Sequence, residues 1–188
     1  MNMGYDVWYN DRDGQFYSQP GFFESRQVLP MYKNGKSEWD DSTDFITKYE
    51  GFSDTTYQKK GDVPTIGYGT TNKKWTSKGK ITVAQARQAM AEDLAANEGL
   101  LRKNIVDYDR LPDSAKTVLR DILYNVGSGN LFSKSPKFMQ ALNARNYEEA
   151  ARQMDWDNNK PGFGGARKRN AARQELFLKD LRSVKPVS

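Results

Sequence analysis

The chain contains no cysteine and no histidine among its 188 residues. The lack of cysteine excludes disulfides and thiolate nucleophiles. The lack of histidine excludes Ser-His-Asp and Cys-His catalysis and the usual zinc sites. No apolar run approaches 18 residues, so we expect no transmembrane helix. Any catalysis must therefore rest on carboxylates, hydroxyls, lysines or backbone groups.

The first fourteen residues (MNMGYDVWYNDRDG) lack both the basic and the apolar region of a secretory signal, and we expect none. Hydrophobic residues make up 37% of the chain, and together with 15 glycines this is a normal apolar fraction for a globular protein. The length predicts one domain with room for an appendage.

Charge is unevenly distributed along the chain. Residues 1–43 carry a net charge of −3 and the remainder +8, within a total of +5. A basic body favours an anionic partner such as nucleic acid, a lipid surface or an acidic cell-wall polymer. Nucleic acid is not expected, because only Phe177 accompanies the C-terminal basic residues Arg167, Lys168, Arg169, Arg173, Lys179 and Arg182.

The N-terminal segment differs in composition from the rest. Nine of the 23 aromatic residues fall within the first 43 positions, with no helical or strand period and with several turn dipeptides. We therefore divide the chain into an irregular, aromatic-rich extension at 1–42 and a main domain at 43–188. The extension either packs its rings on the main domain or docks into a larger assembly, since aromatics are enriched at interface anchors.

The main domain is predicted to open with a short helix over residues 44–50. Asp41, Ser42 and Thr43 supply candidate N-caps, and Gly51 a left-handed C-cap. Residues 52–76 are rich in Thr, Tyr and Gly, which predicts a small β-hairpin or meander.

Helices follow this sheet. Thr82 and Gln85 form a capping-box pattern that starts a long helix over 82–104. Further helices are expected over 111–125, 136–142, 147–154 and 166–182. This order predicts an α+β chain whose sheet is confined to one lobe.

The segment from Glu50 to Thr70 carries the chemistry. A helix C-terminus disfavours an anion, and Tyr49 and Phe52 would shield Glu50 from water, which favours the neutral acid that protonates a glycosidic oxygen. Gly67 and Gly69 would let the backbone approach a substrate. The alternative is a solvated helix end followed by glycines that only bend a strand.

Glu50-Gly51, then Tyr57, then residues 65–70 (TIGYGT) resemble the signature of the phage-type lysozymes, the endolysins. The resemblance covers residues 43–180, with further segments in the family's order at 121–127 (DILYNVG), 142–151 (LNARNYEEAA), Trp156, 165–169 (GARKR) and 175–177 (ELF). It implies a lysozyme-like two-lobed fold in which a small sheet lobe and a helical lobe flank a cleft and the helix 82–104 joins them.

The implied substrate is peptidoglycan, cleaved at the β-1,4 bond between N-acetylmuramic acid and N-acetylglucosamine, with no cofactor. Glu50 matches the family's general acid and Thr65 the threonine that helps hold the attacking water. Asn125 matches a polar cleft position, and Arg169 matches a basic position in the last helix. Without a secretory signal, such an enzyme would reach the wall through a membrane pore or with a phage virion.

Three further expectations concern single positions. Tyr68 is the best sugar-contact candidate, because it lies between Gly67 and Gly69 where the backbone is most accessible. Arg167 or Arg169 is expected to pair with Glu50 across the cleft. Trp156 is expected in the core, and residues 155–159 (DWDNN), the only candidate cation site, are better explained as a turn.

One position departs from the family. The family places Asp or Cys nine residues after the glutamate, where this chain has Lys59. In the first of three hypotheses, Asp62, or less readily Asp54, takes over the role of that carboxylate. In the second, Glu50 acts alone and forms a 1,6-anhydro product, as lytic transglycosylases do. In the third, activity is reduced or lost, and the domain binds glycan or serves as a structural part of an assembly that docks through residues 1–42.

Overall fold

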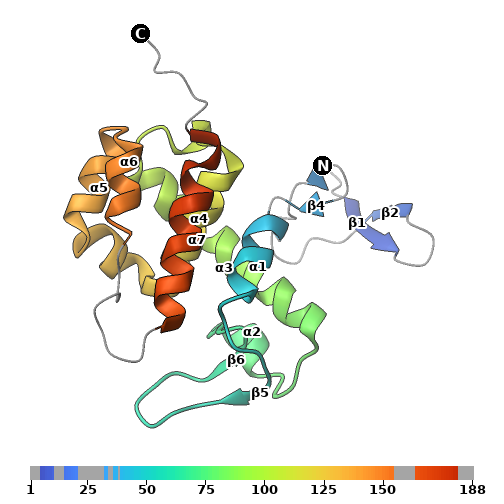
Figure 1. Ribbon diagram of the computed structural model, residues 1–188. Helices are drawn as coiled ribbons and strands as arrows, with labels where there is room; N and C mark the ends of the chain where they lie inside the picture. The colour runs from blue at the N-terminus through green and yellow to red at the C-terminus, as the bar shows by residue number, and fades with distance from the viewer. Residues whose placement is uncertain are drawn as a thin grey trace.

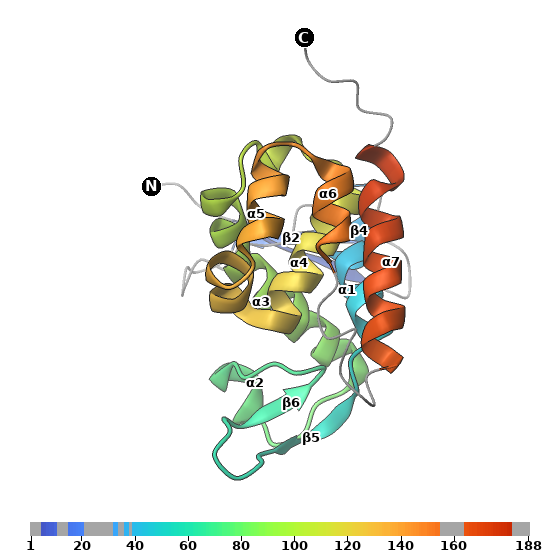
Figure 2. The same cartoon turned by 60° about the vertical axis from the view of Figure 1, so that its left-hand side comes forward.

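The computed structural model describes residues 5–10, 15–20, 32–33, 36–37, 39–154 and 164–181. A small lobe of two strands and a short helix lies beside a larger lobe of helices, and helix α3 connects the two (Figures 1 and 2). This arrangement confirms the α+β, two-lobed fold expected from the sequence.

The main domain contains, in chain order, α1 (Asp40–Thr47), β5 (Ser53–Tyr57), β6 (Thr65–Gly67), α2 (Lys73–Thr76), α3 (Val83–Asn104), α4 (Asp113–Ser128), α5 (Pro136–Asn143), α6 (Tyr147–Arg152) and α7 (Gly164–Leu181). A 3-10 turn at Tyr108–Arg110 precedes α4 and a π-helical segment at Gly129–Ser133 follows it. Gly127, at φ 77°, interrupts the helical path near the end of α4, where the sequence predicted the helix to stop. Across the described residues no helix combines the length and apolarity needed to span a bilayer.

Helix α1 begins and ends earlier than predicted. Its N-cap is Trp39, a buried residue whose carbonyl accepts the backbone N–H and the hydroxyl of Thr43. Burial of the indole therefore starts the helix ahead of the predicted caps, and Thr43 lies inside it. Glu50 consequently follows the helix by three residues instead of occupying its last turn. Gly51 is also not left-handed, so the predicted C-cap is wrong.

The N-terminal segment was expected to lack regular structure. The structure instead forms two antiparallel pairs there, β1 (Tyr5–Asn10) with β2 (Gln15–Pro20) and β3 (Tyr32–Lys33) with β4 (Lys36–Ser37). The division of the chain at residue 43 stays a prediction.

Helix α3 joins the lobes because its buried face changes partners along its length. The predicted capping box is confirmed: the Thr82 hydroxyl accepts the Gln85 N–H and the Gln85 side chain accepts the Thr82 N–H. Near this end, Ala86 and Ala89 pack on the small lobe with Ile66, Trp75 and Ile81. At the other end, Leu101 enters the core of the helical lobe.

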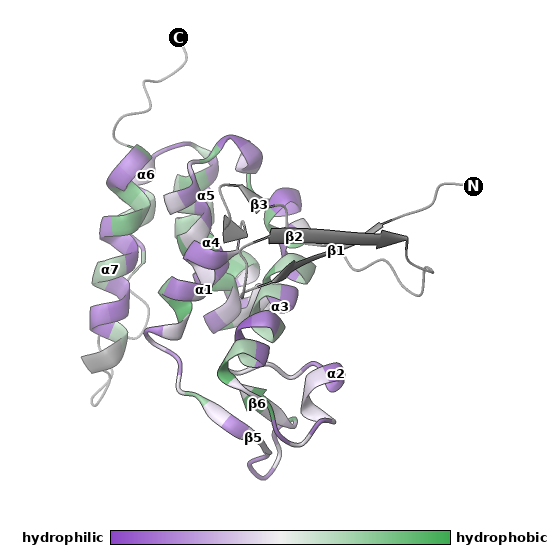
Figure 3. Ribbon diagram, turned by 90° about the vertical axis from the view of Figure 1, so that its right-hand side faces the viewer, coloured by the Kyte–Doolittle hydropathy of each residue, from purple (hydrophilic) through white to green (hydrophobic). Residues whose placement is uncertain are grey.

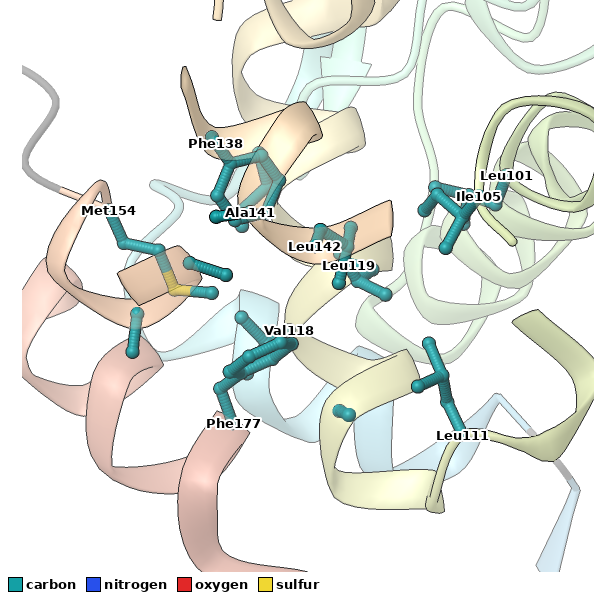
Figure 4. Packing of buried hydrophobic residues seen from close by; sticks show 14 of the residues in the cluster. Leu101, Ile105, Leu111, Val118, Leu119, Phe138, Ala141, Leu142, Met154 and Phe177 are labelled. Carbon is teal, nitrogen blue, oxygen red and sulfur yellow. The ribbon is translucent and has the colours of Figure 1, made fainter. Parts of the chain in front are cut away.

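The main core fills the helical lobe (Figure 4). Leu119, Phe138, Leu142 and Phe177 are almost fully buried within it and come from α4, α5 and α7. Hydrophilic and hydrophobic residues alternate along the ribbon of α7, as expected for a helix with one face in the core (Figure 3).

Polar contacts of α3 reinforce both connections. In the small lobe, Glu92 accepts the Trp75 indole N–H at 2.8 Å. In the helical lobe, buried Glu98 accepts two hydrogen bonds from Arg120, at 2.7 and 3.0 Å, and one from the Tyr108 hydroxyl. Because a buried charge is tolerated only when paired, Glu98 and Arg120 fix the packing of α3 on α4.

A third carboxylate of α3, Asp93, lies next to Thr70. Burial raises the pKa of Asp93 and the charge of Glu92 adds to this, while hydrogen bonds with Thr70 and Asn72 oppose it. The raised pKa means that the folded protein binds the Asp93 proton more tightly than the unfolded chain does. The contribution of Asp93 to the free energy of unfolding is therefore greatest when Asp93 is protonated, and it falls as the pH rises through the folded-state pKa of Asp93.

We accordingly expect Asp93→Asn, which keeps an acceptor for Thr70, to raise the free energy of unfolding at pH 7 relative to the parent chain. The gain should vanish below the ordinary aspartate value of 3.8. Urea unfolding at pH 7 and at a pH below 3.8 measures this gain, with Asp62→Asn at an exposed position as the control. A loss of stability at pH 7 would contradict this account.

Gly67 provides a second test. It has φ +67°, and a Cβ added there would lie 2.9 Å from the Ala86 Cβ of α3, whereas Gly61, at φ +89°, faces open space. Gly67→Ala should therefore lower the free energy of unfolding by about 3 kcal/mol, from backbone strain plus overpacking. Gly61→Ala should cost only about 1 kcal/mol. Equal losses in urea titrations would refute the packing role.

Candidate active site

Glu50 lies just beyond α1, where the chain leaves the helical lobe for β5. Its side chain is 24% exposed, and Oε1 accepts a hydrogen bond from Nη1 of Arg169 at 2.6 Å. The predicted pairing of Glu50 with the last helix is thus confirmed for Arg169, while the neighbouring Arg167 is exposed. The arginine also lies over the ring of Tyr49, 5.5 Å from its centroid.

Behind Arg169 is a carboxylate with no exposed surface. Asp121 of α4 accepts hydrogen bonds from Nη2 of Arg169 and from Nε of Arg173, both at 2.5 Å. Arg173 also donates to Asn170, at 2.9 Å, and to Asn125, at 3.2 Å. The two predicted polar positions, Asn125 and Arg169, therefore belong to one network that starts at Glu50.

The two arginines respond differently to burial. Burial alone lowers the pKa of Arg169, but hydrogen bonds and charges from Asp121 and Glu50 outweigh it, so the pKa is raised. Burial dominates at Arg173 and lowers its pKa despite the charge of Asp121. Arg169 is therefore a permanent cation beside Glu50.

Thr65 begins β6 and is paired with Tyr57 of β5. Residues directly opposite in an antiparallel pair project from the same face of the sheet, so Thr65 and Tyr57 share a face. The Thr65 hydroxyl donates to the carbonyl of Val63 at 3.0 Å. Its oxygen therefore keeps lone pairs that can accept a hydrogen bond from water.

Tyr124 of α4 contacts the segment that follows β6. Its hydroxyl donates to the carbonyl of Tyr68 at 3.0 Å. Burial raises the pKa of Tyr124, and the charges of Asp93, Glu50 and Tyr57 raise it further. Tyr124 therefore joins α4 to the small lobe at Tyr68, and its hydroxyl is influenced by the charge of Glu50.

The predicted sugar-contact segment is used partly within the fold. Tyr68 is half-buried, packs against α3 and lies 5.2 Å from the Phe52 ring. Gly67 is required by the close approach of α3, and a Cβ at Gly69 would lie 3.5 Å from the Tyr124 hydroxyl. Gly67 thus has a packing reason of its own, Gly69 has a backbone reason in its φ of +109°, and substrate contact at these positions stays a prediction.

The turn between β5 and β6 contains the position at which phage-type lysozymes have a second carboxylate and this chain has a lysine. Lys59 and Asp62 are both exposed there, and the Asp62 N–H donates to the Lys59 carbonyl at 3.0 Å. Asp54 forms an ion pair with Lys80 at 3.3 Å. The structure therefore favours Asp62 over Asp54 as the available carboxylate, although no hydrogen bond or ion pair among the described residues joins Asp62 to Glu50.

Helix α7 is less basic on its surface than its sequence suggests, because Arg169 and Arg173 are buried in the network. Trp156, the candidate cation site at 155–159 and Arg182 lie outside the described residues. Among the residues the structure describes, no group of three or more acidic side chains is placed to bind a metal ion.

Sequence reasoning missed Asp121, Arg173 and Tyr124 as members of the site. A signal was present: Asp121 and Asn125 are four residues apart, as are Arg169 and Arg173. Residues at this spacing share a helix face, so two complementary polar faces predict a contact between the two helices.

Comparison with known proteins places the chain. A model of the phage lysozyme family matches residues 47–173. None of the curated proteins compared with the chain matches it. Among solved structures, the endolysin from Escherichia coli O157:H7 phage FAHEc1 is 25% identical, with a TM-score of 0.61 over 83% of this chain and 100% of that chain.

Two further structures show the fold. The muramidase domain of SpmX from Asticaccaulis excentricus is 20% identical over 74% of this chain and 95% of that one, with a TM-score of 0.62. A mutant of P22 lysozyme is 23% identical over 74% and 96%, also at 0.62. The family match spans about two thirds of the chain and includes Glu50 and Thr65, so the chain belongs to the phage lysozyme family.

Proposed function

We propose that the protein hydrolyses peptidoglycan at the β-1,4 bond between N-acetylmuramic acid and N-acetylglucosamine, with Glu50 as the proton donor. Membership of the phage lysozyme family supports peptidoglycan hydrolase activity in general. The observation that carries the specific proposal is the Glu50 carboxyl group, partly exposed between the lobes and held by Arg169.

In this mechanism Glu50 protonates the glycosidic oxygen while the bond to the sugar breaks. Arg169 occupies Oε1, so we place the transferable proton on Oε2. Thr65 lies on the sheet face that also carries Tyr57, and its hydroxyl has acceptor capacity for the attacking water. No cofactor takes part in this scheme.

Glu50→Gln should reduce the release of muropeptides from purified peptidoglycan by at least about a hundredfold, because a general acid contributes that much or more. The matched control is Glu175→Gln, the same change at an exposed position of α7. Mass spectrometry of the digest measures both. Equal activity of the two variants would remove Glu50 from the mechanism.

We further propose that Asp62 orients the water in place of the carboxylate that Lys59 replaces. Asp62 is exposed in the hairpin turn, whereas Asp54 is engaged by Lys80. A carboxylate stabilises the positive charge that develops on the sugar, and a lysine opposes it.

Asp62→Asn should therefore abolish muropeptide release, and Lys59→Asp should leave it unchanged or raise it. The same digest provides the readout, with Asp109→Asn at an exposed site of the helical lobe as the control. Full activity of Asp62→Asn would exclude Asp62. In that case, 1,6-anhydro ends would identify the single-glutamate, transglycosylase-type reaction.

The second candidate is a virion or assembly component with little or no activity. Lys59 at the family's carboxylate position and the aromatic-rich segment 1–42 favour it, with that segment as the docking element for phage proteins. If the folded parent chain released no muropeptide fragments from peptidoglycan, that result would support this role. For the active enzyme, we propose access to the wall after release from the host cytoplasm through a pore, or delivery with a virion.

A further inference from the structure

Glu50 belongs to a cluster of four charged groups whose formal charges cancel. Glu50 and Asp121 supply two negative charges, and Arg169 and Arg173 two positive ones. Glu50 is the only one of the four with more than a tenth of its side chain exposed. The cluster therefore has one exposed end, at the proposed proton donor, and a buried end centred on Asp121.

We propose that Asp121 is a positioning residue for Glu50: it orients Arg169 toward the proton donor and cancels the charge of the second arginine. This rests on the proposed function for its role in the reaction. Asp121 itself touches no substrate, since its side chain is 0% exposed.

The orientation follows from the geometry of the guanidinium group. Arg169 contacts Asp121 through Nε, at 3.2 Å, and Nη2, at 2.5 Å, along one edge of its planar fork. Its remaining nitrogen, Nη1, points away from that edge and donates to Glu50 at 2.6 Å. Because the fork is rigid, fixing one edge on Asp121 fixes the direction of the donor that Glu50 receives.

The charge balance follows from the second arginine. Arg173 does not contact Glu50, yet the charge of Glu50 stabilises the Arg173 cation. Asp121 compensates one of the two arginine charges, so the pair of buried arginines leaves one positive charge for Glu50 to balance.

Two tyrosines extend the surroundings of this cluster. Arg169 lies over the ring of Tyr49, and the charges of Asp93, Glu50 and Tyr57 raise the pKa of Tyr124 on α4. In the described part of the chain, Arg169 forms the ion pair with Glu50, and Asp121 links Arg169 to Arg173.

Three variants test the proposal through the direction in which each shifts the pH dependence of activity. Asp121→Asn leaves one excess positive charge and should move the alkaline limb of the pH–activity profile to lower pH by about one unit. Arg173→Gln leaves one excess negative charge and should move it to higher pH. The double variant restores neutrality and should return the limb to within a few tenths of a unit of the parent.

Titration of the Glu50 carboxyl carbon by NMR supplies a readout that needs no substrate, with circular dichroism to verify folding. The Glu50 midpoint should shift in the same order. If Asp121→Asn does not fold, Arg173→Gln and the double variant still decide.

Unshifted midpoints in folded variants would overturn the proposal, and so would shifts of the same sign for both single variants. Ordered NMR shifts without any peptidoglycan digestion would support Asp121 as the group that sets the charge at Glu50 and would refute the enzymatic function instead.

Discussion

The Asp121 carboxylate, enclosed between two arginines, is the interaction on which the site depends. Transferring an ion from water to a protein interior costs several kcal/mol unless hydrogen bonds and opposite charges replace its hydration. Asp121 meets that condition only when α7 packs against α4 with Arg169 and Arg173 facing inward. The contact therefore couples the docking of the last helix to the placement of the cation beside Glu50.

Helix α3 extends the same principle to the small lobe. Glu92 accepts the Trp75 indole N–H in the small lobe, and Glu98 pairs with Arg120 in the helical lobe. Each lobe is therefore attached to α3 through one carboxylate of that helix. The apolar contacts of Ala86 and Leu101 accompany them. Because both lobes attach to one rigid element, the face of the small sheet keeps a defined relation to Glu50.

Local rules predicted much of this arrangement. The capping box at Thr82, the break at Gly127 and the small hairpin follow from residue types at fixed spacing, and such signals act over a few residues. The start of α1 did not follow, because it is set by burial of Trp39 against helices distant in sequence. The site shows the same division between local and tertiary signals. Glu50, Thr65 and Arg169 could be named from motifs, whereas the pairing of Asp121 with Arg173 depends on tertiary packing. The functional roles of Glu50, Thr65, Asp62 and Tyr68 all stay predictions.

The two halves of the proposed site are stabilised independently, and this explains how Lys59 is compatible with the fold. The proton donor depends on buried charges in the helical lobe, where losing one partner leaves another uncompensated. The proposed water-binding side lies at the β5–β6 turn, where the side chains of Lys59 and Asp62 are exposed and the turn is held through backbone carbonyls that accept the Asp62 N–H and the Gln58 side-chain amide. A change of charge at residue 59 thus costs little folding free energy, whereas a change at Asp121 costs much. The structure therefore constrains the position of Glu50, the proposed proton donor, strictly. The group that would orient the water is free to vary in identity and position.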